Sequence, residues 1–207
     1  LIPVIERIRS RFRVGQFCIV ADRGMISADN LKKLQKREMP YILGTRMRKV
    51  NEIKRDVLSR PGRYKEVYPE GKTSKDPAPL KVKEVYLDGD RYIVCLSPKQ
   101  ARKDAQDRQV IIDSLKDKIK TGPKSLIGNK GYRKYLKIER NSVSIDQEKI
   151  EYDSRFDGKW VLITNTDFSP EQAAIKYKEL WQVEHLFRDV KSVLETRPVY
   201  HHRDENI

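Results

Sequence analysis

Two acidic residues of this chain occupy positions where a carboxylate could take part in chemistry. The first, Asp22, directly follows an apolar run over residues 17–21 that is typical of a buried parallel strand, and a glycine comes two residues later. Ligands of open α/β sheets bind outside the carboxyl ends of the strands. Asp22 is therefore either a residue that caps its own turn or a carboxylate that holds a ligand, and the strand leaves both interpretations open.

The second acidic residue, Glu184, lies in a predicted helix over residues 170–194. Tyr177, Glu184 and Lys191 are spaced seven and seven residues apart, which places them on nearly one line along one helix face. A carboxylate among apolar residues is costly to desolvate unless a cation compensates it. That cation is either Arg188, in an ion pair four residues on, or a metal shared with other carboxylates. The apolar residues predicted on this face are Ala173, Leu180, Trp181, Phe187 and Leu194.

The elements that would position Asp22 form an α/β pattern. A helix is predicted over residues 2–12, a strand over 17–21, a second helix over 28–38 and a second strand over 41–43. Ser27 is the expected N-cap of the second helix. Strand, helix and strand within about thirty residues indicate a βαβ unit with two parallel strands.

The middle of the chain has a different pattern. Residues 47–59 are predicted as a charged helical segment that ends at Pro61-Gly62. Strands over 82–87 and 91–96 flank Asp88-Gly89-Asp90, which is a strong hairpin signal.

A long helix to about residue 120 is predicted to follow this hairpin. It begins at Ser97-Pro98-Lys99-Gln100, where serine is the N-cap and proline is the first helical residue. The glutamine side chain is expected to accept a hydrogen bond from the backbone N–H of the serine. Short strands should come next, the last of them over residues 159–164. Ser169-Pro170-Glu171-Gln172 then repeats the capping pattern at the start of the helix that carries Glu184. The apolar stripe of the long helix, which we interpret as packing, consists of Ala101, Ala105, Ile112, Leu115 and Ile119.

The composition favours a polyanionic partner. Lys and Arg number 44 against 30 Asp and Glu, so the formal charge is +14. Basic runs over residues 44–65 and 120–140 are candidates for contacts with DNA phosphates. No apolar run approaches the ~20 residues that span a bilayer, and no secretory signal is present, so we expect no membrane partner. Cys18 and Cys95 both lie in apolar runs and are interpreted as buried thiols rather than as a disulfide.

Several segments taken together resemble a known family. They are Ile19-Val20-Ala21-Asp22-Arg23-Gly24-Met25, the run over residues 160–166, the Tyr177…Glu184…Lys191 pattern and Arg197-Pro198-Val199-Tyr200-His201. In this order they resemble the DDE transposases of bacterial insertion sequences, over essentially the whole chain. More narrowly, they resemble the branch whose catalytic glutamate lies in a Tyr-x2-Arg-x3-Glu-x6-Lys signature.

The resemblance assigns roles to individual residues. Asp22 matches the second catalytic aspartate and Glu184 the catalytic glutamate, while Tyr177 and Lys191 match signature residues that lie near the DNA backbone of the transposon end. Position 180, where the signature has arginine, is Leu180 here, so that phosphate contact is absent or comes from a neighbour such as Arg188. The family's first catalytic aspartate would precede Leu1. We therefore expect a partial transposase that is inactive by itself.

The resemblance also implies the fold and the domains. We expect an incomplete ribonuclease H-like core of the α/β class, formed by residues 1–60 and 166–207 and interrupted by a β-rich insertion over residues 61–165. The alternative for the insertion is a separate small β domain. A cytoplasmic bacterial protein is expected, with a homodimer possible in the full-length protein.

The implied reaction is metal-dependent cleavage of DNA and transfer of a strand. Two divalent ions stabilise charge on the attacking and leaving oxygens of such a displacement at phosphorus. Mg²⁺ or Mn²⁺ accepts oxygen ligands, and Asp22 and Glu184 would supply two of them. The partners would be the transposon ends and the target DNA. The alternative function is a basic, non-catalytic nucleic-acid-binding α/β module, in which Glu184 pairs with Arg188 and Asp22 is a turn residue.

Overall fold

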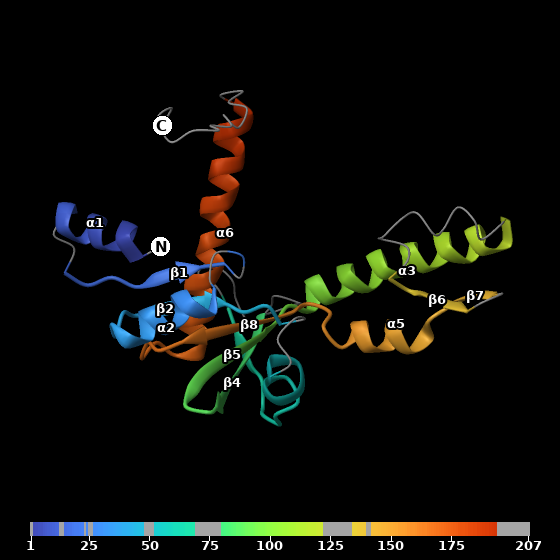
Figure 1. The fold of residues 1–207 in the computed structure, drawn as a ribbon, viewed down its shortest axis with the longest axis horizontal. Helices are drawn as coiled ribbons and strands as arrows, with labels where there is room; N and C mark the ends of the chain where they lie inside the picture. Colours follow the sequence, from blue (N-terminus) through green and yellow to red (C-terminus); the bar gives the residue numbers. More distant parts are fainter. Residues whose placement is uncertain are drawn as a thin grey trace. The chain divides into compact units, whose positions relative to one another are not determined.

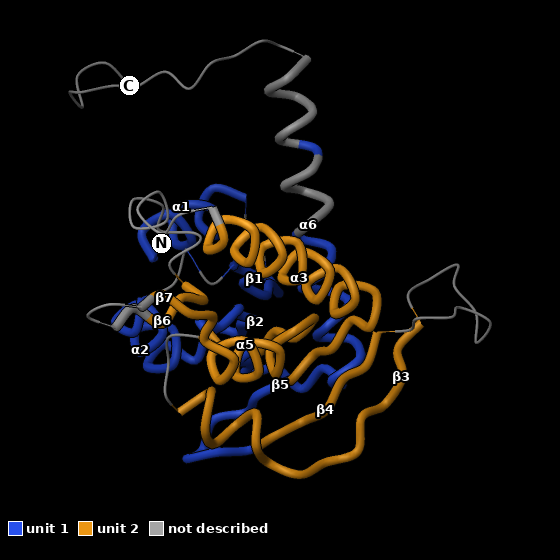
Figure 2. The backbone as a smooth tube through the Cα atoms, turned by 90° about the vertical axis from the view of Figure 1, so that its right-hand side faces the viewer, with its two compact units in different colours: residues 1–46, 86–93, 162–207 blue, residues 47–85, 94–161 orange. Residues whose placement is uncertain are grey.

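The computed structural model describes residues 2–12, 15–22, 24, 27–47, 52–68, 80–121, 134–139 and 142–193 (Figure 1). Near the end of the last range, the description of residues 181–185 and 187–193 is limited to the backbone. The chain divides into two compact units (Figure 2). The first comprises residues 1–46, 86–93 and 162–207, and the second comprises residues 47–85 and 94–161.

The first unit contains the predicted βαβ element. Strand β1 (Ile19–Ala21) pairs in parallel with β2 (Tyr41–Gly44), and α2 (Ala28–Lys36) connects them. The predicted N-cap is confirmed, since the Ser27 side chain accepts a hydrogen bond from the Asn30 N–H. The predicted first helix is confirmed as α1 (Ile2–Phe12). Strand β1 begins two residues later than predicted and is only half-buried over Ile19 and Val20, because in the strand order it is an end strand next to β2 alone.

Two further elements complete the part of the first unit that carries the predicted site. Strand β8 (Lys159–Thr164) runs antiparallel to β2, with Thr164 opposite Ile42 and Ile163 opposite Leu43. Helix α6 (Pro170–Val193) follows and contacts both β1 and β2. The strand over 159–164 and the helix after Ser169 were both predicted. The core of this unit includes Leu34, Tyr41, Ile42, Leu43 and Ala173, all almost fully buried.

The predicted hairpin is confirmed. Strand β4 (Leu80–Leu87) and strand β5 (Asp90–Leu96) are joined by Asp88 and Gly89 alone. These two residues have φ angles of 51° and 84°, as a two-residue type I′ turn requires, and Asp-Gly is a preferred pair for that turn. The strands of the main sheet follow the order β1-β2-β8-β5-β4-β3, and β4, β5 and β8 contribute residues to both units.

The second unit is richer in helix than its sequence suggested. Strand β3 (Lys65–Val67) pairs antiparallel with β4, and β6 (Leu136–Glu139) pairs antiparallel with β7 (Ser142–Ile145). The segment after β7, for which only strands were predicted, contains helix α5 (Gln147–Ser154). The Asp146 side chain accepts a hydrogen bond from the Lys149 N–H and caps this helix, so an N-cap signal was present in the sequence.

Two other expectations for the second unit need correction. Within the charged segment predicted as helical over residues 47–59, Met47 lies in a turn, and the described helical residues are Glu52 and a short π-helix, η1 (Ile53–Val57). Residues 48–51 lie outside the described residues. On helix α3 (Pro98–Thr121), Ile112 and Leu115 are buried as predicted, but Ala105 is exposed. The buried Leu115 packs in a small apolar core with Tyr135 and Leu136.

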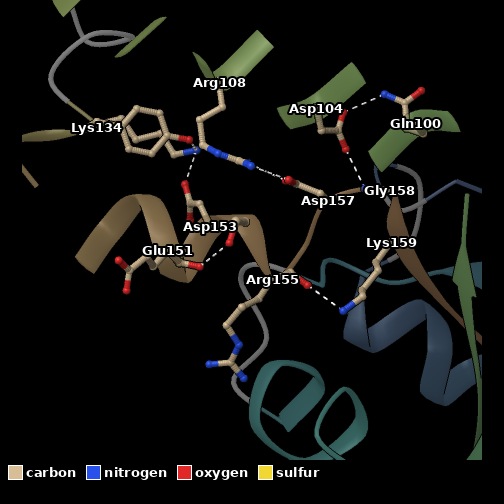
Figure 3. A network of polar contacts seen from close by, with 12 residues as sticks. Gln100, Asp104, Arg108, Lys134, Glu151, Asp153, Arg155, Asp157, Gly158 and Lys159 are labelled. Carbon is tan, nitrogen blue, oxygen red and sulfur yellow. Dashed lines mark hydrogen bonds and ion pairs between the residues drawn. The ribbon is translucent and has the colours of Figure 1, made fainter. Parts of the chain in front are cut away.

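On the first half of α3, polar groups lie on the inward face beside the half-buried Ala101 of the predicted stripe (Figure 3). The Asp104 carboxylate accepts a hydrogen bond of 2.8 Å from the Gly158 N–H. Arg108 donates two hydrogen bonds, of 2.6 and 2.5 Å, to the two carboxylate oxygens of Asp157, and both side chains are only 12 % exposed. These contacts fix the turn that leads from α5 into β8 against the side of α3.

A second carboxylate in this network, Asp153, is buried and faces two lysines. The Lys134 ammonium lies 2.5 Å from one carboxylate oxygen and the Lys149 ammonium 3.4 Å from the other. Burial alone would raise the pKa of Asp153, but the hydrogen bond and charge of Lys134 and the charge of Lys149 outweigh it, so that the pKa lies below its ordinary value.

The expected capping pattern at the start of α3 is only half formed. The Ser97 side chain accepts a hydrogen bond from the Gln100 N–H, as predicted. The Ser97 N–H, which Gln100 was expected to cap, instead donates to the Gly158 carbonyl oxygen at 2.9 Å. The Gln100 side chain therefore donates to Asp104.

Candidate functional site

Asp22, the first acidic residue predicted to act, lies directly after the last residue of β1 and is half-buried. Its carboxylate oxygen Oδ1 accepts a hydrogen bond of 2.7 Å from the hydroxyl of Tyr177 on α6. The two residues are 155 positions apart in the sequence. The structure thus brings together two of the residues that the sequence singled out, Asp22 at a strand end and Tyr177 on the helix that carries Glu184.

The starting point of α6 is fixed by the end of β8. The Thr164 hydroxyl donates to the Tyr41 carbonyl oxygen at 2.7 Å. The Asn165 side chain accepts a hydrogen bond from the Tyr41 N–H at 2.9 Å and donates one to the Met39 carbonyl oxygen at 3.1 Å. Asn165 therefore ties the residue after β8 to the beginning of β2 through both of its polar atoms.

The loop between β8 and α6 is held by one further side chain. Arg91 of β5 donates hydrogen bonds to the carbonyl oxygens of Thr166, at 2.5 Å, and Phe168, at 2.8 Å. At the next residue the predicted capping pattern is complete. The Ser169 N–H donates to the Gln172 side chain at 3.0 Å, and the Gln172 N–H donates to the Ser169 hydroxyl at 3.2 Å.

The first turns of α6 pack against the strands of the first unit. The helix buries Ala173 and Ala174 completely and contacts both β1 and β2. Tyr177 is seven residues from Pro170, which at 1.5 Å per residue is about 10 Å along the helix axis. At this level of the helix the Tyr177 hydroxyl contacts the Asp22 carboxylate, directly after the end of β1.

The remaining predicted residues continue along the same helix. Glu184 follows Tyr177 by seven residues, so its backbone lies about 10 Å further along α6. The side chains of Glu184, Arg188 and Lys191 lie outside the described residues, and so do the predicted approach of Glu184 to Asp22 and its alternative ion pair with Arg188. Within the part of the chain that the structure describes, no group of three acidic, histidine or cysteine side chains forms a metal site.

Charged and sulfur-containing side chains lie near the Asp22–Tyr177 pair. Burial raises the pKa of the Cys18 thiol, and the positive charge of Lys176, which precedes Tyr177, partly offsets this effect. The Lys176 ammonium also lies 5.0 Å from the centre of the Phe168 ring. Both cysteines are free thiols, as predicted, with Cys18 half-buried and Cys95 fully buried.

The first unit also contains an open pocket of about 550 Å³, whose polar lining includes Gln35, Tyr41, Arg91, Asn165 and Asp167. Tyr41 is the first residue of β2, and β2 runs parallel to β1, so the pocket lies toward the opposite end of these strands from Asp22. Neither Arg91 nor Asn165 was predicted from the sequence to position the site. Asn165 did carry a signal, since it is a polar residue between a predicted strand and a capping pattern, whereas no local pattern marks Arg91.

Part of the first predicted basic run lies on the second unit. Arg55, Arg60, Arg63 and Lys65 are exposed there, around η1 and the start of β3. Most of the second basic run, over residues 122–133, lies outside the described residues. Among the described helices, none is long and apolar enough to cross a membrane.

The chain was compared with protein families, with curated proteins and with solved structures. The family model described as "Transposase DDE domain" matches residues 1–206, which is nearly the entire chain. Neither a curated protein nor a solved structure shows significant similarity to the chain.

Proposed function

Because the chain belongs to the transposase DDE domain family, and so to proteins of DNA transposition, we propose that it acts in metal-dependent DNA cleavage and strand transfer, with Asp22 and Glu184 as catalytic carboxylates. The observation that carries the proposal is the hydrogen bond from Tyr177 to Asp22. It links the helix that bears Glu184 to the strand end where an α/β sheet binds its ligands.

The proposed donor set suits a hard divalent cation. Asp22 and Glu184 offer only carboxylate oxygens, which Mg²⁺ and Mn²⁺ prefer, and the half-buried Asp22 carboxylate accepts a hydrogen bond from the Tyr177 hydroxyl. When bound, such ions stabilise the charge that develops on the attacking and leaving oxygens at phosphorus. The chain's own contribution is to bind the ions through Asp22 and Glu184 and to fix the direction of α6 through the anchors around Asn165 and Arg91.

The finer assignment places the chain in the branch of insertion-sequence transposases with the Tyr-x2-Arg-x3-Glu-x6-Lys signature. Tyr177, Glu184 and Lys191 match it, and Leu180 stands where the signature has arginine. In this proposal Arg188 and Lys191 contact the backbone of the transposon end. The exposed basic residues Arg55, Arg60, Arg63 and Lys65 add contacts to DNA phosphates, which position DNA without reading its sequence.

An excision assay in cells that carry the natural gene and its flanking DNA tests the catalytic assignment. Asp22→Ala and Glu184→Ala should each reduce excision to background, because the loss of one carboxylate removes a ligand of the catalytic ions. Asp29→Ala is the matched control, since Asp29 is an exposed aspartate on α2 that forms an ion pair with Lys33 four residues away. Normal excision by Asp22→Ala would leave the non-catalytic DNA-binding module as the better account.

DNA binding is tested by fluorescence anisotropy with a duplex at several salt concentrations. The logarithm of affinity should fall linearly with the logarithm of salt, with a slope of about −0.9 for each phosphate contacted. Arg60→Ala and Arg63→Ala should each reduce the slope by roughly this amount. Lys33→Ala, which removes an exposed lysine already paired with Asp29, should leave it unchanged. Binding that is insensitive to salt would argue against the basic surface.

A further inference from the structure

The hydroxyl of Tyr177 has one hydrogen to donate, and in this structure Asp22 accepts it. The same hydrogen cannot be donated to a DNA phosphate at the same time. The signature led us to expect Tyr177 at the DNA backbone, but its partner is the carboxylate that we assign to metal binding. Tyr177 therefore contacts the proposed acidic site directly, within the first unit.

The tyrosine is a rigid donor. Its helix is anchored by the buried Ala173 and Ala174 against β1 and β2, and its first turn is capped by the reciprocal bonds of Ser169 and Gln172. Tyr177 follows this anchored turn by one further turn and is itself half-buried. The backbone that carries this hydroxyl is therefore held by contacts that do not involve Asp22.

The acceptor, in contrast, needs such support. Asp22 follows a strand of three residues at the end of the sheet order, where only one neighbouring strand restrains the backbone. A carboxylate on a short end strand can rotate away from a metal, and a hydrogen bond from a fixed group restricts that rotation. Hydrogen bonds to metal-binding carboxylates commonly change metal affinity by 10-fold to 100-fold.

We propose that Tyr177 is a positioning residue that orients the Asp22 carboxylate for a divalent cation, and that this role, rather than a DNA contact, is its main contribution. The inference rests on the proposed function, which makes Asp22 a metal ligand. It predicts that metal binding and DNA binding separate in a variant that lacks only the hydroxyl.

The test measures Mn²⁺ binding by electron paramagnetic resonance, and duplex binding by anisotropy in the presence of EDTA. Tyr177→Phe should bind Mn²⁺ 10-fold to 100-fold more weakly than the unaltered chain, yet bind DNA with unchanged affinity in EDTA. Asp22→Ala should weaken Mn²⁺ binding at least as much. Tyr152→Phe is the matched control, because Tyr152 lies on α5 of the second unit and the variant keeps the ring that packs against Phe156. It should behave as the unaltered chain in both assays.

The outcomes separate the two proposals. Mn²⁺ affinity that is unchanged in Tyr177→Phe but lost in Asp22→Ala would overturn the positioning role and leave the proposed function standing. Weaker DNA binding by Tyr177→Phe in EDTA, without a change in Mn²⁺ affinity, would return Tyr177 to the DNA backbone. No Mn²⁺ binding by the unaltered chain, or equal binding by Asp22→Ala, would remove the metal assignment of Asp22 itself.

A second measurement needs no substitution at Tyr177, so it applies even where that variant does not fold. Tyrosine labelled with ¹³C at Cζ gives one resonance for each tyrosine of the unaltered chain. Substoichiometric Mn²⁺ should broaden the Tyr177 resonance well before that of Tyr152, because Tyr177 contacts the proposed ligand. Equal broadening of the two resonances would contradict the proposal.

Discussion

The backbone at Gly158 has no room for a side chain. A Cβ atom there would overlap the Ser97 carbonyl oxygen and would lie 2.6 Å from the Ala101 nitrogen and 2.8 Å from the Ala101 Cβ. Most of these neighbours are backbone atoms at the start of α3, so they cannot rotate away. The φ angle of 62° adds a second cost, because side chains disfavour this left-handed region.

These two effects set the expected loss for Gly158→Ala. The left-handed conformation costs about 1–2 kcal/mol for a residue with a Cβ atom. Forcing an extra carbon into a packed site costs about 1–3 kcal/mol more, through shifts of the backbone. The free energy of unfolding should therefore fall by about 2–5 kcal/mol, measured by urea denaturation with circular dichroism at neutral pH.

Substitutions at two other glycines separate the conformational cost from the steric cost. Gly89 has a φ angle of 84° but open space around its Cβ position, so Gly89→Ala should show the conformational cost of about 1–2 kcal/mol alone. Gly15 has open space and no positive φ angle, so Gly15→Ala should change stability by less than about 1 kcal/mol, in the stabilising direction. Equal losses for Gly158→Ala and Gly89→Ala would refute the steric part of the reasoning.

Three further predictions concern the ion pairs and the thiols. The lowered pKa of Asp153 contributes stability above its unfolded pKa of about 3.9, and this contribution is lost as pH falls through the lower folded value. Asp153→Asn should therefore make unfolding free energy less dependent on pH below about pH 4. Arg108→Met and Asp157→Asn should each cost about 3 kcal/mol in urea denaturation, and the double variant less than their sum, because each single change leaves a charge or polar group unpaired. Burial raises the pKa of both thiols, and Cys95 is fully buried, so Ellman's reagent should label Cys18 first and Cys95 only after unfolding.

Local signals predicted much of the fold. The hairpin turn at Asp88-Gly89, the caps at Ser27 and Ser169, and the βαβ unit all appear where the sequence placed them. Each depends on residues close together in the chain, where turn chemistry and periodicity determine the structure. Asp22 and Tyr177 were likewise each predicted as site residues from the local pattern of their own element, but the hydrogen bond between them was not predicted.

The hydrogen bonds that were not predicted from the sequence join residues that are far apart in the chain. Asp104 and Arg108 occupy the inward face of α3, where an apolar stripe was predicted, because Gly158 and Asp157 supply polar partners from about fifty residues away. The Ser97 N–H was expected to donate a hydrogen bond within its own helix, but it donates to the carbonyl oxygen of Gly158, which is also far away in the sequence. Hydrophobic periodicity predicts that one face of a helix is buried, but it does not predict which distant residues contact that face.

The cap at Ser169 and the contact of Tyr177 with Asp22 make the number of residues in the first two turns of α6 part of the site. Thr164 and Asn165 fix where the loop begins, and Ser169 fixes where the helix begins. One residue inserted within the helix between Ser169 and Tyr177 would turn Tyr177 by about 100° around the helix axis and advance it by about 1.5 Å, which would carry it away from Asp22. Related sequences should therefore keep the length of these two turns constant and confine insertions and deletions to the loops of the chain.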